Sequence, residues 1–116
     1  MASIALLAGA CAPTIDDVKQ RPVLLELTVP AAWDRVGACI ASTYNGDYVP
    51  LYLPVFSERR AEVIVQFIVN GAPWTQAVFQ IVGGEATKVT WQRVATIAVE
   101  TMERKARETI ERCGRV

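Results

Sequence analysis

The sequence predicts an α+β domain in which an antiparallel sheet carries two helices packed on one face, in the order β-α-β-β-β-β-α. Several segments alternate apolar and polar residues, which is the pattern of half-buried strands. Two other segments place apolar residues three and four positions apart, as amphipathic helices do. Turn-forming pairs such as Asn70-Gly71 separate successive strands, so neighbouring strands are expected to form antiparallel hairpins.

Length and composition favour one folded domain. The chain has 116 residues, 52% hydrophobic and 21% charged, which suits a single hydrophobic core. We expect this domain to span residues 23–116. Residues 1–10 are interpreted as a signal segment, and residues 11–22, which contain two prolines and no clear period, as a tether.

The first half of the domain is predicted to contain a strand, a helix and an edge strand, at residues 23–29, 31–43 and 48–56. Pro30 suits the first turn of the helix, where its missing N–H is not needed. Asn45-Gly46-Asp47 then ends the helix. Pro50 and Pro54 cannot donate ladder hydrogen bonds, so the following strand is expected at a sheet edge.

The second half is predicted to contain three strands and a helix, at residues 61–69, 75–82, 86–91 and 96–113. Asn70-Gly71 and Gly83-Gly84 mark the turns between the strands. The final helix has an apolar stripe and, on its other side, acid-first charge pairs four residues apart; the stripe consists of Val99, Met102, Ala106, Ile110 and Cys113. We expect this stripe to lie on the sheet.

This order of elements resembles the helix-grip and TBP-like architectures over residues 23–113. The resemblance is one of element order and carries no motif, so it implies a fold and no functional residues. Folds of this kind include binding domains and lipid carriers. A small-molecule or lipid-binding domain, with a cavity between helices and sheet, is therefore one alternative function.

Composition argues against several classes of function. The 12 basic and 12 acidic residues give a net charge of zero, which does not favour nucleic-acid binding. The absence of histidine excludes Ser-His-Asp and Cys-His hydrolases. The three cysteines lie far apart, so no zinc site is expected. We therefore predict a protein that is not an enzyme and needs no cofactor or metal.

The N-terminal residues point to export. Residues 1–10 are uncharged and rich in small and apolar residues, and Leu7-Ala8-Gly9-Ala10-Cys11 resembles the lipobox of bacterial lipoproteins. The resemblance covers the first eleven residues and implies cleavage before Cys11, acylation of Cys11, and a lipid anchor in a cell-envelope membrane, facing the periplasm. Ala8-Gly9-Ala10 also suits an ordinary signal peptidase. Another alternative is a cytoplasmic protein in which residues 2–10 begin a buried helix and Cys11 is a small apolar residue.

The other two cysteines are predicted to form a disulfide. Cys39 and Cys113 lie on the apolar stripes of two helices that should face the same core. In an exported chain of three cysteines, one pair and one lipidated residue account for all three. The alternative is a pair of buried free thiols in a cytosolic protein.

Two surfaces are candidates for a protein partner. Three tyrosines recur every four residues across the turn and the edge strand, namely Tyr44, Tyr48 and Tyr52. The sheet face away from the helices would carry Leu24, Ile64 and Ile68 among polar residues, a mixed surface that a partner could cover. The leading hypothesis is a non-enzymatic envelope lipoprotein with a small interaction domain. A third hypothesis is an intracellular protein-interaction module.

Overall fold

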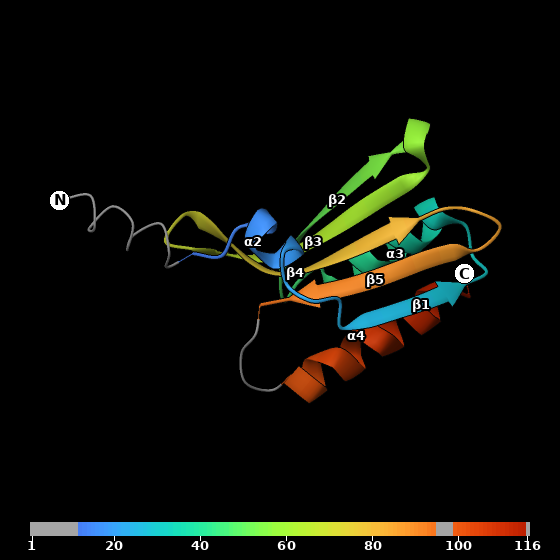
Figure 1. Cartoon of the computed structure of the whole chain (residues 1–116). Helices are drawn as coiled ribbons and strands as arrows, with labels where there is room; N and C mark the ends of the chain where they lie inside the picture. Colours follow the sequence, from blue (N-terminus) through green and yellow to red (C-terminus); the bar gives the residue numbers. More distant parts are fainter. Residues whose placement is uncertain (1–11, 95–98, 116) are drawn as a thin grey trace.

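The computed structural model describes residues 12–94 and 99–115 and contains a five-stranded sheet with helices on both faces (Figure 1). The strands lie in the order β1-β5-β4-β3-β2, and each neighbouring pair is antiparallel. The elements are α2 (Ile15–Lys19), β1 (Leu25–Val29), α3 (Trp33–Tyr44), β2 (Val49–Val55), η1 (Phe56–Glu58), β3 (Arg60–Val69), β4 (Ala72–Val82), β5 (Thr87–Arg93) and α4 (Val99–Cys113). The structure confirms the α+β class and the predicted element order from β1 to α4.

The connections follow from the turn residues. Helix α3 carries the chain from β1, at one edge of the sheet, to β2 at the other edge, and β2 to β5 then return as consecutive hairpins. Asn70 and Gly71 join β3 to β4 with φ angles of 52° and 80°. Two successive left-handed residues make the tight turn that matches the twist of paired strands. Strand β2, with its two prolines, lies at an edge as predicted.

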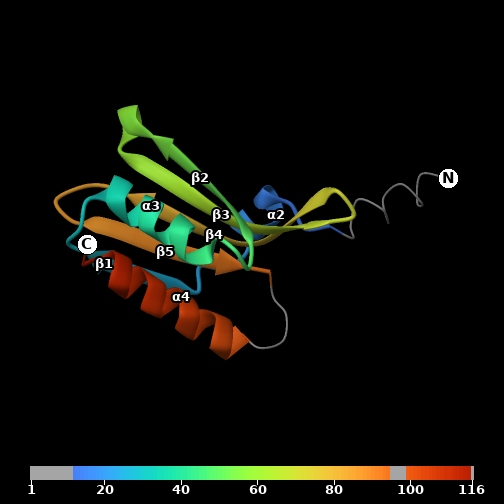
Figure 2. The ribbon, with the colours of Figure 1, turned by 180° about the vertical axis from the view of Figure 1, so that it is seen from behind.

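The main core lies between the sheet and the two longer helices. Helices α3 and α4 pack against each other and cover the same face of the sheet (Figure 2). The largest wholly buried side chains there are Trp91, Phe79, Ile40, Ile81 and Ile110. Of the predicted α4 stripe, Ala106, Ile110 and Cys113 are fully buried and Met102 packs at the margin. Side chains therefore fill the space between helices and sheet.

The segment expected to be a tether is instead folded. Helix α2 occupies residues 15–19, and Thr14 caps it with its hydroxyl oxygen, which accepts a hydrogen bond from the backbone N–H of Asp17 at 3.1 Å. The Asp17 carboxylate accepts in return from the backbone N–H of Thr14 at 2.9 Å. This reciprocal capping box satisfies two backbone donors that a helix start otherwise leaves without partners. Residues 11–22 were thus wrongly interpreted as a tether over most of their length.

Helix α2 lies on the sheet face opposite α3 and α4. Its Val18 is fully buried against Ile64 of β3 and Val78 of β4. Gln92 of β5 donates hydrogen bonds from Nε2 to the backbone oxygens of Lys19 and Arg21, at 2.9 and 2.7 Å. The sheet face opposite α3 and α4, which the sequence analysis left open to a partner, is therefore covered in part by α2.

Candidate functional site

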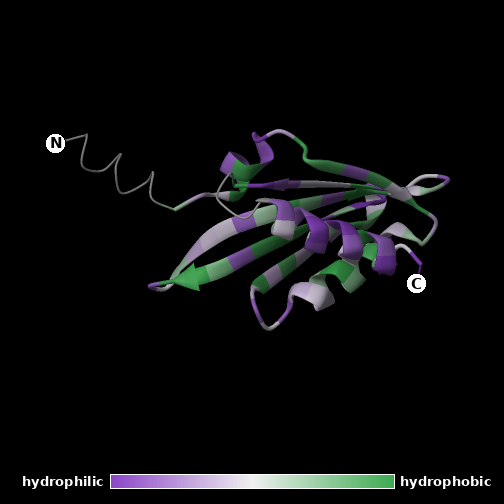
Figure 3. Cartoon of the chain, turned by 90° about the horizontal axis from the view of Figure 1, so that it is seen from below, coloured by the Kyte–Doolittle hydropathy of each residue, from purple (hydrophilic) through white to green (hydrophobic). Residues whose placement is uncertain are grey.

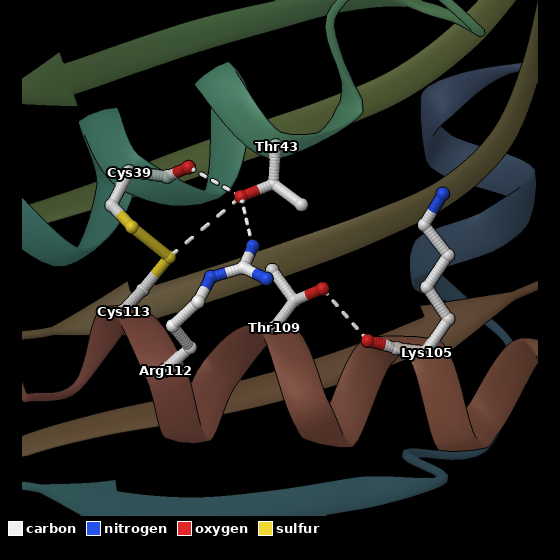
Figure 4. Close-up of a disulfide and its surroundings, with 6 residues drawn as sticks. All are labelled: Cys39, Thr43, Lys105, Thr109, Arg112 and Cys113. Atoms are coloured by element: carbon white, nitrogen blue, oxygen red, sulfur yellow. Dashed lines mark hydrogen bonds between the residues drawn. A yellow bond between two sulfur atoms is a disulfide. The ribbon is translucent and has the colours of Figure 1, made fainter.

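The structure brings the two predicted cysteines together. Cys39 of α3 and Cys113 of α4 form a disulfide with their Cα atoms 5.6 Å apart, at a sequence separation of 74 (Figure 4). Beside it, the Thr43 hydroxyl donates to the Cys39 carbonyl at 2.9 Å and accepts from Arg112 Nη2 at 2.7 Å. The bond joins the two helices that close the main core. Closing so long a loop stabilises the fold by about 4 kcal/mol in the chain-entropy model.

The first of the three tyrosines, Tyr44, belongs to the core. Only 4% of its surface is exposed, and its ring packs against Phe79 with ring centroids 5.5 Å apart. Burial raises the pKa of its phenol to about 12, although a hydrogen bond with the Thr109 side chain opposes the shift. Tyr44 is therefore unavailable to a partner.

Tyr48 forms an aromatic cluster at one end of the sheet. Its ring centroid lies 5.7 Å from that of Tyr44 and 5.1 Å from that of Phe67 on β3. The Lys105 ammonium of α4 lies 4.9 Å from the Tyr44 ring centroid and 5.9 Å from that of Tyr48. A cation over aromatic faces gains about 0.5–1 kcal/mol at an exposed site. The cluster joins α3 and β3 to Lys105 in the middle of α4.

Tyr52 has a separate, structural role in the middle of β2. Its hydroxyl donates to the Asp34 carbonyl at 3.0 Å, and its ring lies against Gly37 of α3. A Cβ atom at Gly37 would come within 2.6 Å of the Tyr52 ring, so glycine permits α3 to approach β2 closely. The three tyrosines therefore do not form one partner surface. Tyr44 is buried in the core, Tyr48 packs beside Phe67, and Tyr52 packs against α3.

The exposed apolar surface lies elsewhere, at the tip of the β3–β4 hairpin. We define the hairpin tip as residues 67–74. Phe67, Ile68 and Val69 are exposed on β3, and Trp74 is half-buried on β4. Charged residues are absent between Glu62 and Glu85. In Figure 3 the end of β3 is coloured hydrophobic, whereas the exposed side of α4 is hydrophilic. The sequence pattern predicted a strand for residues 67–69 and a turn at Asn70-Gly71, but it left Trp74 outside the strands and did not indicate that the tip extends beyond the helices.

A second apolar surface follows the edge strand β2. Val49, Leu51 and Leu53 are exposed and pair with Gln66, Ile64 and Glu62 of β3, so they share the face that carries α2. Prolines at the alternate positions 50 and 54 lack an N–H, which weakens pairing of this edge with another strand. The row of Val49, Leu51 and Leu53 can therefore contact a partner through side chains rather than by strand addition.

An open cavity of about 510 Å³ lies beside α2 on the same face. Ile15, Lys19, Glu62, Gln66 and Thr75 are among the residues that line it. Lys19 and Glu62 form an ion pair across its wall. The sequence placed a ligand cavity between the helices and the sheet, where side chains are instead closely packed. A ligand of this cavity would meet both apolar groups and charge.

Arg93, near this end of β5, is another buried polar residue that the sequence analysis did not single out. It is 3% exposed, and burial lowers the pKa of its guanidinium. The strand predicted from the sequence ends at residue 91, two positions before Arg93, and the sequence pattern does not indicate that Arg93 is buried.

Across residues 12–94 and 99–115, His, Cys, Asp and Glu side chains nowhere gather in a group of three that could hold a metal ion. Within the same residues, no helix has both the length and the apolar character needed to cross a bilayer. Cys11 and the expected signal segment lie outside the described residues. Comparisons with protein-family models, curated proteins and solved structures find no match.

Proposed function

We propose that this chain is a non-enzymatic cell-envelope lipoprotein, anchored through Cys11 and facing the periplasm, with a small domain that interacts with another envelope component. The observation that carries the proposal is the disulfide between Cys39 and Cys113. Disulfides of this structural kind persist in oxidising compartments and are rare in the cytosol. The bond supports export, and it leaves Cys11 as the one cysteine without a partner in the sequence.

The position of Cys11 supports lipidation. It follows the small residues of Leu7-Ala8-Gly9-Ala10, and the folded domain begins only a few residues later, at α2. An acylated Cys11 would hold the domain directly at the membrane surface, because residues 13–21 are committed to the fold. A partner would then meet the row of Val49, Leu51 and Leu53 on the edge strand.

The test is the mass and location of the mature protein. We expect the mature chain to start at Cys11 and to carry diacylglycerol, and Cys11→Ser to move from the membrane fraction to the soluble fraction because its main hydrophobic anchor is lost. Ala12→Ser is the matched control, since it introduces a serine beside Cys11 and leaves both the lipidation site and the disulfide intact. Unchanged membrane association of Cys11→Ser would contradict lipidation, and free thiols at all three cysteines would favour an intracellular protein.

A second candidate function is the binding of a small molecule or lipid. The cavity of about 510 Å³ beside α2 favours it, since ligand sites commonly have this size. Native mass spectrometry of the purified protein would reveal a co-purifying ligand. Gln66→Trp would fill the cavity from β3 and is expected to release that ligand, whereas Gln76→Trp serves as the control because Gln76 does not line the cavity.

A further inference from the structure

The described chain begins beside the apolar hairpin. The backbone N–H of Thr75, at the base of the hairpin tip, donates to the carbonyl oxygen of Pro13 at 3.1 Å. In Figure 1 the hairpin reaches out on the side where the described chain starts. Cys11 lies two positions before Pro13, and two extended residues span at most about 7 Å. A lipid on Cys11 would therefore lie close to the hairpin.

The hairpin reaches at least as far as such an anchor. Thr75 lies four positions after Gly71 at the turn, which corresponds to about 13 Å along a strand. This length exceeds the span between Pro13 and Cys11. A bilayer that holds an acyl chain on Cys11 is therefore within reach of the tip.

The chemistry of the tip suits the boundary between water and lipid. Ile68 is 51% exposed and Val69 45%, and Phe67 beside them is exposed on the side away from the Tyr48 ring. Tryptophan is enriched at membrane interfaces, and Trp74 lies on the paired strand. The absence of charge between Glu62 and Glu85 removes the largest cost of entering lipid.

We infer that the hairpin tip is a membrane-contacting element, which inserts Phe67, Ile68, Val69 and Trp74 into the outer part of the bilayer beside the lipid anchor. This inference rests on the proposed lipidation of Cys11. The acyl chains hold the protein on the membrane, and the hairpin fixes its orientation. The opposite end of the sheet, with the β4–β5 turn, then faces away from the membrane.

The experiment supplies the anchor chemically, so that it does not depend on processing in a cell. Because Cys39 and Cys113 form a disulfide, the Cys11 thiol of the full chain can be coupled to a maleimide phospholipid in phosphatidylcholine vesicles. Vesicles with brominated acyl chains then quench tryptophans that enter the bilayer. Trp33 and Trp91 are buried, and the Trp74→Phe variant isolates the contribution of Trp74.

Two valines provide a matched pair of variants. Val69 and Val82 are each 45% exposed, but Val82 lies at the far end of β4. We expect quenching of Trp74 in the parent protein and in Val82→Asp, and its loss in Val69→Asp, because a carboxylate at the tip opposes insertion. Melting curves in solution establish that both variants fold.

Absence of Trp74 quenching in the parent protein would overturn the inference, as would equal quenching in Val69→Asp and Val82→Asp. Dissociation of a dimer by Val69→Asp, without quenching in the parent, would identify the tip as a contact between two copies and would also overturn it. The proposed function fails separately, if the mature protein carries no lipid on Cys11.

Discussion

The two faces of the sheet are covered by helices of very different length. On one face lie α3, of 12 residues, and α4, of 15 residues, joined by a disulfide over the main core. On the other face lies α2, a helix of five residues with one buried side chain, Val18. The packing of α3 and α4 on the first face is stabilised by extensive burial of apolar side chains. The packing of α2 on the second face depends on a few specific contacts.

The α2 face shows how a very short helix can be stable within a folded domain. A helix of five residues is not stable in isolation, because nucleation costs more than so few hydrogen bonds return. Helix α2 is held by its capping box at one end and by Gln92 at the other. We therefore expect the α2 face to open at a lower free energy than the α3–α4 face.

The largest effect is expected at the centre of the α4 stripe. Ile110 is fully buried, so Ile110→Asp would place a carboxylate without a partner in the main core, at a cost of several kcal/mol, which is comparable to the whole stability of a small domain. Circular dichroism should show loss of folded protein. Arg104 is exposed on the same helix, and Arg104→Ala is expected to cost less than about 1 kcal/mol. Similar melting temperatures for the two variants would contradict this picture of α4.

Loss of the disulfide is the next largest effect. The double variant Cys39→Ala, Cys113→Ala is expected to unfold with about 2–5 kcal/mol less free energy than the parent, the usual cost for a small disulfide-bonded domain. Chemical denaturation under non-reducing conditions measures it. Cys11→Ala is the control, because it leaves the disulfide intact. Two alkylatable thiols in the native parent protein would refute the pairing.

A smaller and local effect is expected on the α2 face. Val18→Ala removes two methyl groups from a fully buried side chain, which costs about 1–2 kcal/mol. Because α2 can detach by itself, the loss should appear mainly as faster hydrogen exchange of the Val18 and Gln20 amides, which are bonded to the carbonyls of Thr14 and Asp16. Val82→Ala, at an exposed valine of β4, should leave these amides unchanged. Equal acceleration in the β3 and β4 amides would show that α2 unfolds only with the whole domain.

The smallest effect is a pH dependence of α2. Hydrogen bonds from the backbone and then the side chain of Thr14 hold the pKa of the Asp17 carboxyl below its usual value of 3.8, with a further contribution from Arg21. Because the folded pKa is lowered, the stabilisation is complete above the unfolded pKa and is lost as pH falls through the folded one. NMR shifts of the α2 amides should therefore move below about pH 4. Asp17→Asn should abolish this step and Asp16→Asn should keep it; a step that survives Asp17→Asn would assign it to another group.

Much of the main core could be predicted from the sequence because its signals are local and repeated. The stripe through Ala106, Ile110 and Cys113 identifies the buried side of α4 within one helix. The same stripes place Cys39 and Cys113 on core-facing sides, which is why their pairing was predictable. Asn70-Gly71 predicts a tight turn, since both residues tolerate the left-handed conformation found there.

The candidate surfaces were harder to predict, because each depends on what packs above a residue. Tyr44, Tyr48 and Tyr52 have the same chemistry and regular spacing, yet one is buried in the core and another is fixed under Gly37. Ile64 and Ile68 lie on the same strand face in the sequence pattern, but α2 covers only Ile64. The alternation of apolar and polar residues along a strand does not indicate which distant segment of the chain packs over a given residue.

The sequence by itself determined the class of the fold, the order of its strands and two longer helices, and the two cysteines that face one core, because periodicity and turn chemistry act over a few neighbouring residues. Only the tertiary structure decided that residues 13–21 fold onto the sheet and that the hairpin tip extends beyond the helices. Those outcomes depend on long-range contacts, such as Val18 with Val78 and Thr75 with Pro13, which join residues some 60 positions apart. These contacts form only once the sheet has folded. A five-residue helix has too little local stability to form without packing on the sheet.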